Sequence, residues 1–234
     1  DKAGAVVHEN QFDLPWEVPA VAVSPVTGTL ALAESSRGFT VTGAGFVAGF
    51  CRKCGTLASL VQGGVERLAE PLAPSFYRAA TEIDRSQNEQ WSGGYRCWYE
   101  AGLKQLTHAV TSMRAFAAGE GRVIVESVID STAPGGELRF RSRIAHAVHA
   151  NGEIRIRHVV DTAPHLMCLP RIGLSLALTN AFDRMTWYGR GPHESYWDRK
   201  ASAHFGVYES PVAERYYPHI YPCECGGIED LRWA

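Results

Sequence analysis

Apolar and charged side chains alternate most regularly in the middle of the chain. Between residues 138 and 148 the apolar side chains share one parity and the arginines the other: Leu138, Phe140, Ile144 and Val148 against Arg139, Arg141 and Arg143. This period of two predicts a half-buried strand with its apolar face inward. The Asn-Gly pair at 151–152 is favoured in two-residue hairpin turns because both positions tolerate positive φ. The alternation resumes over residues 154–160, so this stretch predicts a β-hairpin.

Further strands are expected on both sides of that hairpin. Residues 123–129 read as a strand that the Pro-Gly-Gly run at 134–136 would reverse, and residues 172–178 alternate again. Together these segments predict four strands joined by short turns, an antiparallel meander. Shorter apolar pieces, separated by Gly or turn residues, occupy residues 39–41, 46–50 and 56–61.

Helix signals are few. Only residues 98–106 and 114–118 have a helical pattern, and both segments are short. No strand–helix alternation of the βαβ type is present, which argues against a (β/α)₈ barrel. The sequence therefore predicts a mainly β protein. Residues 187–233, dense in aromatic, Pro, Gly and charged residues without a clean period, are expected to pack as loops over the scaffold, where binding sites usually lie.

Composition narrows the function classes. Among 234 residues there are 23 Lys and Arg against 25 Asp and Glu, and this net charge of −2 argues against a nucleic-acid partner. A chain that is 45% hydrophobic and 21% charged can bury a core instead of remaining disordered. No apolar run approaches the roughly 18 residues of a membrane span, so no membrane partner is expected. The first residues lack a signal-peptide pattern, so we expect a cytoplasmic location, and secretion stays open.

The six cysteines suggest a metal site at first. Cys51 and Cys54 have the spacing of half a zinc site, but Cys223-x-Cys225 misses the spacing of a second half. We therefore interpret Cys51 and Cys54 as residues of a hairpin turn. Buried thiols are expected at two further positions, Cys97 and Cys168. No disulfide, metal or cofactor is predicted.

Two acidic segments offer candidate chemistry. Glu82 and Asp84 stand two residues apart after Arg78, so in an extended chain their side chains would point the same way. Carboxylates can hold sugar hydroxyls, and aromatic rings stack on the apolar faces of sugars. The second acidic segment, residues 193–198, contains His193, Glu194 and Asp198 beside aromatic residues, and Glu224 follows later.

Three interpretations of these carboxylates stay open. Paired carboxylates hydrolyse glycosides when they lie about 5–9.5 Å apart across the bond. His193 and Glu224 could instead act as general acid and base on a sugar, as in an aldose epimerase. The same side chains also suit salt bridges and caps that hold loops together. No phosphate-binding Gly-rich loop and no Gly-x-Ser-x-Gly nucleophile motif is present.

Several motifs, in order, resemble the last domain of the large β-galactosidases of glycoside hydrolase family 2. Residues 189–200 resemble its Gly-x-Gly-Pro-x-Glu-Asn-Tyr-x-Asp-Arg motif, and residues 76–84 its Phe-Trp-Arg-Ala-Pro-Thr-Asp-Asn-Asp run. Residues 217–224 are similar to its Pro-Tyr-x-x-Pro-x-Glu-Asn-Gly segment, and residues 230–233 to its Asp-Val-Arg-Trp. Residues 50–60 resemble a hairpin of that domain, and residues 11–15 the closing strand of the domain before it.

The resemblance implies a fold for this chain and different roles for the domains of the enzyme. The fold would be an antiparallel β-supersandwich of the galactose-mutarotase type over residues 36–234, with the last strands of that domain expected beyond Ala234. Residues 1–35 would be the tail of a preceding β-sandwich domain and a linker. In this family the two catalytic glutamates belong to a (β/α)₈ barrel, and the loop matching residues 85–94 borders the mouth of the active site.

Some positions depart from the family pattern. Ala80 replaces Pro, Glu82 replaces Asp, and Ser195 replaces Asn. Cys223, Cys225 and Ile228 stand where Gln, Asn and Arg are usual. An Arg replaced by Ile removes a five-donor fork that can hold a carboxylate or a sugar, so the groove is expected to be altered.

The sequence thus predicts an accessory domain that shapes and gates the active-site rim of a retaining β-galactosidase, inactive by itself. Its expected partners are a β-galactoside within the full enzyme and the remaining domains of that polypeptide; homo-oligomers stay open. The alternatives are a free-standing carbohydrate-binding or aldose-epimerase-like protein and a purely structural interface module. We expect the candidate carbohydrate-binding residues to converge on one concave face. They are Arg78, Glu82, Asp84, His193, Glu194, Asp198, Glu224 and Arg232.

Overall fold

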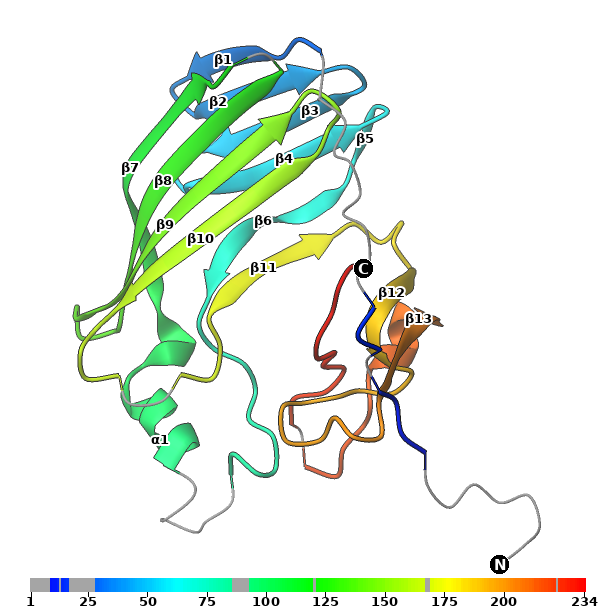
Figure 1. Cartoon of the computed structure of the whole chain (residues 1–234). Helices are drawn as coiled ribbons and strands as arrows, with labels where there is room; N and C mark the ends of the chain where they lie inside the picture. Colours follow the sequence, from blue (N-terminus) through cyan, green and yellow to red (C-terminus); the bar gives the residue numbers. More distant parts are fainter. Residues whose placement is uncertain are drawn as a thin grey trace, which may run out of the picture. The chain divides into compact units, whose positions relative to one another are not determined.

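The chain divides into two compact units in the computed structural model (Figure 1). The larger unit contains residues 24–179, and the smaller combines residues 1–23 with 180–234. The structure describes residues 9–12, 14–16, 28–85, 93–119, 121–166, 169–221 and 223–234. In these ranges no helix is long and apolar enough to cross a membrane.

Two antiparallel sheets form most of the larger unit. The first has five strands in sequence order: β1 (Ala31–Ser35), β2 (Gly38–Gly43), β3 (Phe46–Cys51), β4 (Thr56–Gln62) and β5 (Val65–Glu66). The second has four, in the order β10-β9-β8-β7: β7 (Thr107–Ala117), β8 (Arg122–Thr132), β9 (Leu138–His149) and β10 (Ile154–Thr162). Figure 1 shows the two sheets lying over one another. The fold is therefore mainly β and antiparallel, as expected, and consistent with a β-sandwich.

The core lies between the two sheets. Val41, Ala48 and Phe50 from the five-stranded sheet pack in one buried cluster with Val125 and Val148 from the four-stranded sheet. Every second residue of β9 is buried from Phe140 to Val148, which confirms the inward apolar face predicted from the alternation. That face also carries buried polar residues, Ser142 and His146, which the hydrophobic pattern did not indicate.

A second buried cluster closes one end of the four-stranded sheet. It joins Phe76, Trp98, Leu103 and Phe140, and the rings of Phe76 and Phe140 stack at 3.8 Å between centroids. Trp98 lies on the helix α1 (Gly93–Glu100) and Leu103 on the 3₁₀ turn η1 (Leu103–Gln105). Helical structure was expected from residue 98 to residue 106, and the structure places it from 93 to 105 with an interruption at Ala101 and Gly102.

Two predictions about the larger unit were wrong. Residues 114–118 were expected to be helical, but residues up to Ala117 lie in β7, where Arg114 pairs across the ladder with Glu126 of β8. The fourth strand of the meander was expected at residues 172–178. That segment forms β11 (Gly173–Leu178), which pairs with β6 (Leu68–Ser75), and β7 completes the four-stranded sheet instead.

The smaller unit is built on a β-hairpin. β12 (Arg184–Gly191) pairs antiparallel with β13 (His204–Pro211), and η2 (Val212–Arg215) follows. Loops alone were expected over residues 187–233, and these strands correct that prediction. The galactose-mutarotase type of the fold and the boundary near residue 35 stay predictions.

Candidate functional site

The last residues of β12 pack closely around two glycines. A Cβ on Gly191 would lie 2.5 Å from Cδ2 of Tyr208, and one on Gly189 would lie 3.1 Å from the Cα of Leu231. Trp187, from the same strand, is 1% exposed, and its indole N–H donates to the carbonyl of Arg190 at 3.1 Å. A side chain at position 191 would clash with Tyr208, and one at position 189 would press against Leu231, so glycine at both positions permits this close packing.

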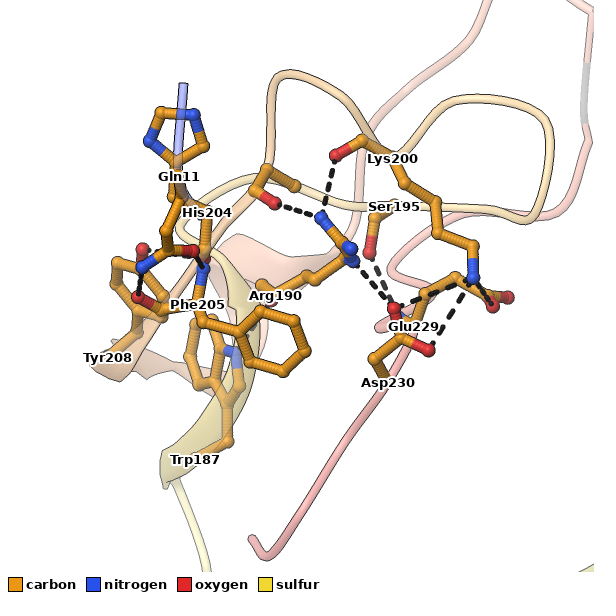
Figure 2. A network of polar contacts seen from close by, with 11 residues as sticks. Gln11, Trp187, Arg190, Ser195, Lys200, His204, Phe205, Tyr208, Glu229 and Asp230 are labelled. Carbon is orange, nitrogen blue, oxygen red and sulfur yellow. Dashed lines mark hydrogen bonds and ion pairs between the residues drawn. The ribbon is translucent and has the colours of Figure 1, made fainter. Parts of the chain in front are cut away.

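A polar network joins this hairpin to the end of the chain (Figure 2). Arg190 donates from Nε to Asp230 at 2.7 Å and from Nη1 to the carbonyls of Lys200 and Ala203 at 3.2 and 2.9 Å. The Arg190 guanidinium lowers the pKa of the Asp230 carboxyl. Lys200 Nζ lies 3.5 Å from carboxylate oxygens of both Glu229 and Asp230. These contacts fix residues 229–230 against β12 and its connecting loop.

Ser195 adds a second attachment for the same segment. It is fully buried; its hydroxyl accepts the N–H of Glu229 at 2.9 Å, and its own N–H donates to the carbonyl of Gly227 at 2.8 Å. Ser195 thus replaces the family Asn at a position that has a structural role here.

An open pocket of about 540 Å³ lies in the smaller unit. Its lining includes two of the expected site residues, His193 and Glu194, together with Trp187, Glu209, Glu214, Arg215, Tyr217 and His219. The guanidinium of Arg215 lies over the Trp187 ring, 4.7 Å from its centroid. The rings of Tyr217 and His219 meet edge to face at 4.7 Å. The pocket therefore combines aromatic surfaces with carboxylates and the guanidinium of Arg215.

Glu194 is oriented by several donors. One carboxylate oxygen accepts the N–H of Gly226 at 2.8 Å, and the other accepts Nη2 of Arg199 at 3.2 Å and lies 3.8 Å from Nε2 of His219. The phenol of Tyr196 lies in the same region and accepts the N–H of Gly227 at 3.3 Å. Burial, with a further contribution from nearby carboxylates, raises the pKa of Tyr196 to about 12, so its hydroxyl stays protonated at neutral pH.

Both ring nitrogens of His193 contact backbone carbonyls. Nδ1 lies 2.7 Å from the carbonyl of Glu194, and Nε2 lies 3.0 Å from the carbonyl of Ser202. In this geometry neither nitrogen is left to exchange a proton with a sugar. The arrangement argues against His193 as the acid or base of an epimerase, but its ring still contributes to the pocket wall.

The other candidates of the smaller unit lie outside this pocket lining. Asp198 is exposed, and Glu224 is partly buried. Arg232 places its guanidinium 5.4 Å from the centroid of the Phe205 ring. The structure therefore brings together His193 and Glu194, and not these three, around the pocket.

In the larger unit, Arg78 and Asp84 form one bidentate ion pair. Nη1 and Nη2 of Arg78 donate to the two Asp84 oxygens at 2.6 and 3.3 Å, and the side chains are only 14% and 17% exposed. Thr81 donates its N–H and its hydroxyl to Asp84 at 2.7 and 2.8 Å. Burial disfavours the Asp84 carboxylate, but the donors from Arg78 and Thr81 outweigh it and lower the pKa. Glu82 is exposed.

The two sets of candidates belong to different units, so their convergence on one face stays a prediction. Most of the loop 85–94, which was expected to border an active site, lies outside the described residues. Gln11 belongs to the smaller unit, where its amide donates to the carbonyl of Phe205 at 2.9 Å. Asp13 in the same motif is not described.

Sequence reasoning missed part of the pocket. Arg215 and His219 were not singled out, because neither lies in a periodic pattern that would indicate its direction. Within the described ranges, no group of three or more His, Cys, Asp or Glu residues is placed to hold a metal ion. Cys54 lies in the turn between β3 and β4, as interpreted from the sequence, and Cys51 is the last residue of β3 before that turn.

The comparisons of this chain with known proteins agree on one family. A family model described as the β-galactosidase small chain matches residues 42–234. The β-galactosidase of Priestia megaterium is 31% identical, over 99% of this chain and 22% of the relative. Those of Vibrio cholerae and Erwinia tasmaniensis are 35% and 30% identical, over 78% and 90% of this chain and 18% and 21% of the relatives.

The chain thus spans about a fifth of the length of these curated relatives. The family model covers well over half of the chain, and it confirms the resemblance that the motifs indicated. The chain belongs to the β-galactosidase small chain family.

Proposed function

We propose that this chain is an accessory domain of a β-galactosidase, which shapes and gates the rim of the active site. The nucleophile and the acid/base glutamate of the retaining reaction would lie in another part of the enzyme. The observation that carries the proposal is the match of residues 42–234 to the small chain family, whose relatives here are named β-galactosidase and are several times longer.

The pocket of the smaller unit suits a carbohydrate. Its volume of about 540 Å³ falls in the range of small-molecule sites, about 300–1,000 Å³. Tyr217 is exposed and lines the pocket, so its ring is available to stack on the apolar face of a sugar. Glu209, Glu214 and Arg215 supply acceptors and donors for hydroxyls. Among the predicted residues, His193 and Glu194 are the ones this pocket supports.

Replacement of the matching segment of the Priestia megaterium relative with this chain tests the accessory role. The chimera is expected to hydrolyse a nitrophenyl β-galactoside, whereas the isolated chain is expected to be inactive. Hydrolysis by the isolated chain would refute the accessory role, and so would a folded but inactive chimera.

A pair of tyrosines tests the sugar contact separately. Tyr217 lines the pocket and Tyr221 does not, although both are exposed and only four residues apart. In titration calorimetry with a β-galactoside, Tyr217→Ala is expected to weaken binding about tenfold, and Tyr221→Ala to leave it unchanged. Equal effects of the two substitutions would contradict the proposal that this pocket binds the sugar.

One observation favours a structural interface as a second function. Residues 216–221 expose large side chains in close succession, with Ile220 94% exposed and Tyr216 and Tyr221 70% and 69% exposed. Exposed apolar surface of this kind is typical of docking surfaces. If this second function holds, Ile220→Asp lowers the activity of the chimera, and Tyr217→Ala leaves sugar affinity unchanged.

A further inference from the structure

The hairpin of β3 and β4 carries two cysteines, Cys51 at the end of β3 and Cys54 in the turn. β3 ends at Cys51 and β4 begins at Thr56, and the N–H of Gly55 donates to the carbonyl of Cys51 at 2.7 Å. Gly55 has a φ of +72°, and a Cβ there would lie 2.9 Å from Cγ2 of Val110. The turn is therefore tight, and it holds Cys51 and Cys54 three residues apart. The proposed function uses neither of them.

Hydrogen bonds within the turn converge on the sulfur of Cys51. The backbone N–H groups of Cys54 and Lys53 and the thiol of Cys54 donate to it, and the Lys53 ammonium adds a favourable charge. Burial opposes ionisation, but these donors outweigh it and lower the pKa of Cys51. The pKa of Cys54 is raised, first by burial and then because its S–H is held by the Cys51 sulfur.

This asymmetry is typical of a nucleophilic thiolate beside a resolving thiol. Both cysteines are only partly buried, so a small molecule can reach them from solvent. The neighbouring Arg52 is engaged elsewhere, since it forms an ion pair with Glu34 and lies 4.7 Å from the centroid of the Phe39 ring. Lys53, which is exposed, is therefore the cation that favours the Cys51 thiolate.

We propose that Cys51 and Cys54 form a redox-active dithiol, which closes to a disulfide by exchange with a small-molecule disulfide. First, the Cys51 thiolate attacks one sulfur of the small disulfide, whose S–S bond breaks and releases one thiolate. Next, the Cys54 sulfur attacks the Cys51 sulfur, breaks the mixed disulfide and releases the second thiolate. Two protein thiols are oxidised, one small disulfide is reduced to two thiols, and the two protons end on the released thiols.

The geometry of the turn permits this bond. Cys51 and Cys54 both lie within the turn that the Gly55–Cys51 hydrogen bond closes, and such a turn keeps its residues near the Cα separation of about 4.4–6.8 Å that a disulfide needs. A closed structural zinc site would need four ligands, and no group of three candidate ligands is present in the described parts of the chain. The turn therefore fits a disulfide better than a metal.

Two trypsin sites between the cysteines allow the disulfide to be detected directly. Trypsin cleaves after Arg52 and Lys53, so it separates Cys51 in the peptide 38–52 from Cys54 in the peptide 54–67. The folded protein is incubated with oxidised glutathione, quenched with acid and alkylating agent, and digested. The expected product is the two peptides joined by a disulfide, with separate peptides restored by dithiothreitol. Cys97→Ser, outside the turn, is expected to leave the joined pair unchanged.

Two variants distinguish the roles of the cysteines. Cys54→Ser is expected to stop at a mixed disulfide of glutathione with Cys51. Cys51→Ser is expected to react at Cys54 at least about tenfold more slowly. The proposal is overturned if no joined peptides form while near-ultraviolet circular dichroism shows the fold intact, or if the two variants react at equal rates.

Discussion

The ion pair of Asp84 with Arg78 gives a sharp test of whether this candidate site residue supports the fold. The perturbation is Asp84→Asn, which keeps the size of the side chain but removes its charge. Asparagine offers one acceptor oxygen, and its NH₂ group would face donors from Arg78 or Thr81. The matched control is Glu82→Gln, because Glu82 stands two residues away in the same acidic run and is exposed.

The expected magnitude follows from the contacts that are lost. Asp84 accepts four hydrogen bonds from Arg78 and Thr81, with donor–acceptor distances of 2.6 to 3.3 Å. Hydrogen bonds to charged groups contribute about 1.5–3 kcal/mol each, but they are not additive and some screening by solvent applies. We therefore expect Asp84→Asn to lower the free energy of unfolding by about 2–3 kcal/mol. Glu82→Gln should change it by less than about 0.5 kcal/mol.

Urea unfolding followed by far-ultraviolet circular dichroism measures both variants. The pKa of Asp84 is lowered in the folded state, so its stabilisation is present above the unfolded pKa of about 3.9 and is lost as the pH falls through the folded pKa. The difference between the wild type and Asp84→Asn should therefore be full at pH 7 and shrink below about pH 4. Equal losses in the two variants, or a difference that does not depend on pH, would refute the reasoning.

Two further substitutions test the larger unit. Glu66 accepts the backbone N–H groups of Leu60, Arg67 and Leu68 at 2.8 to 3.0 Å, so Glu66→Gln should cost about 1–2 kcal/mol in urea unfolding, against no change for the exposed Glu70→Gln. His146 is fully buried, and burial lowers its pKa to about 4. The unfolded chain then binds a proton that the folded chain does not, so stability falls by at most about 1.4 kcal/mol per pH unit from about pH 6.5 down to pH 4. His146→Leu should remove that slope, and a slope that persists in the variant would assign it to other groups.

Strands could be predicted from the sequence where the residues that determine them are close together in the chain. The β9–β10 hairpin could be recognised because alternation and an Asn-Gly turn act within a few residues. The helical reading of residues 114–118 failed because a ladder partner, Glu126 opposite Arg114, decides the strand there. The pairing of β11 with β6 joins segments about a hundred residues apart, and no local pattern indicates such a partner.

The candidate site shows the same division. The motif residues His193 and Glu194 could be singled out from the sequence, and they line the pocket. The donors that orient Glu194 come from Gly226 and Arg199, and Arg215 reaches the pocket from η2. Such contacts depend on where loops meet, which periodicity does not encode.

By itself, the sequence determined the mainly β class, the inward face of β9 and the family, because alternation and ordered motifs are carried by neighbouring residues. Only the tertiary structure decided that Asp84 is held by Arg78 and Thr81 while Glu82 faces solvent, although both looked alike in the sequence. It also decided that Ser195 and Asp230 attach residues 229–230 to β12 and to the loop that follows it. The physical reason is that hydrogen-bond partners depend on the path of the backbone in space, in a local turn for Asp84 and between segments 30 to 40 residues apart for Ser195 and Asp230. That path fixes whether a polar side chain binds within the protein or stays available to a ligand.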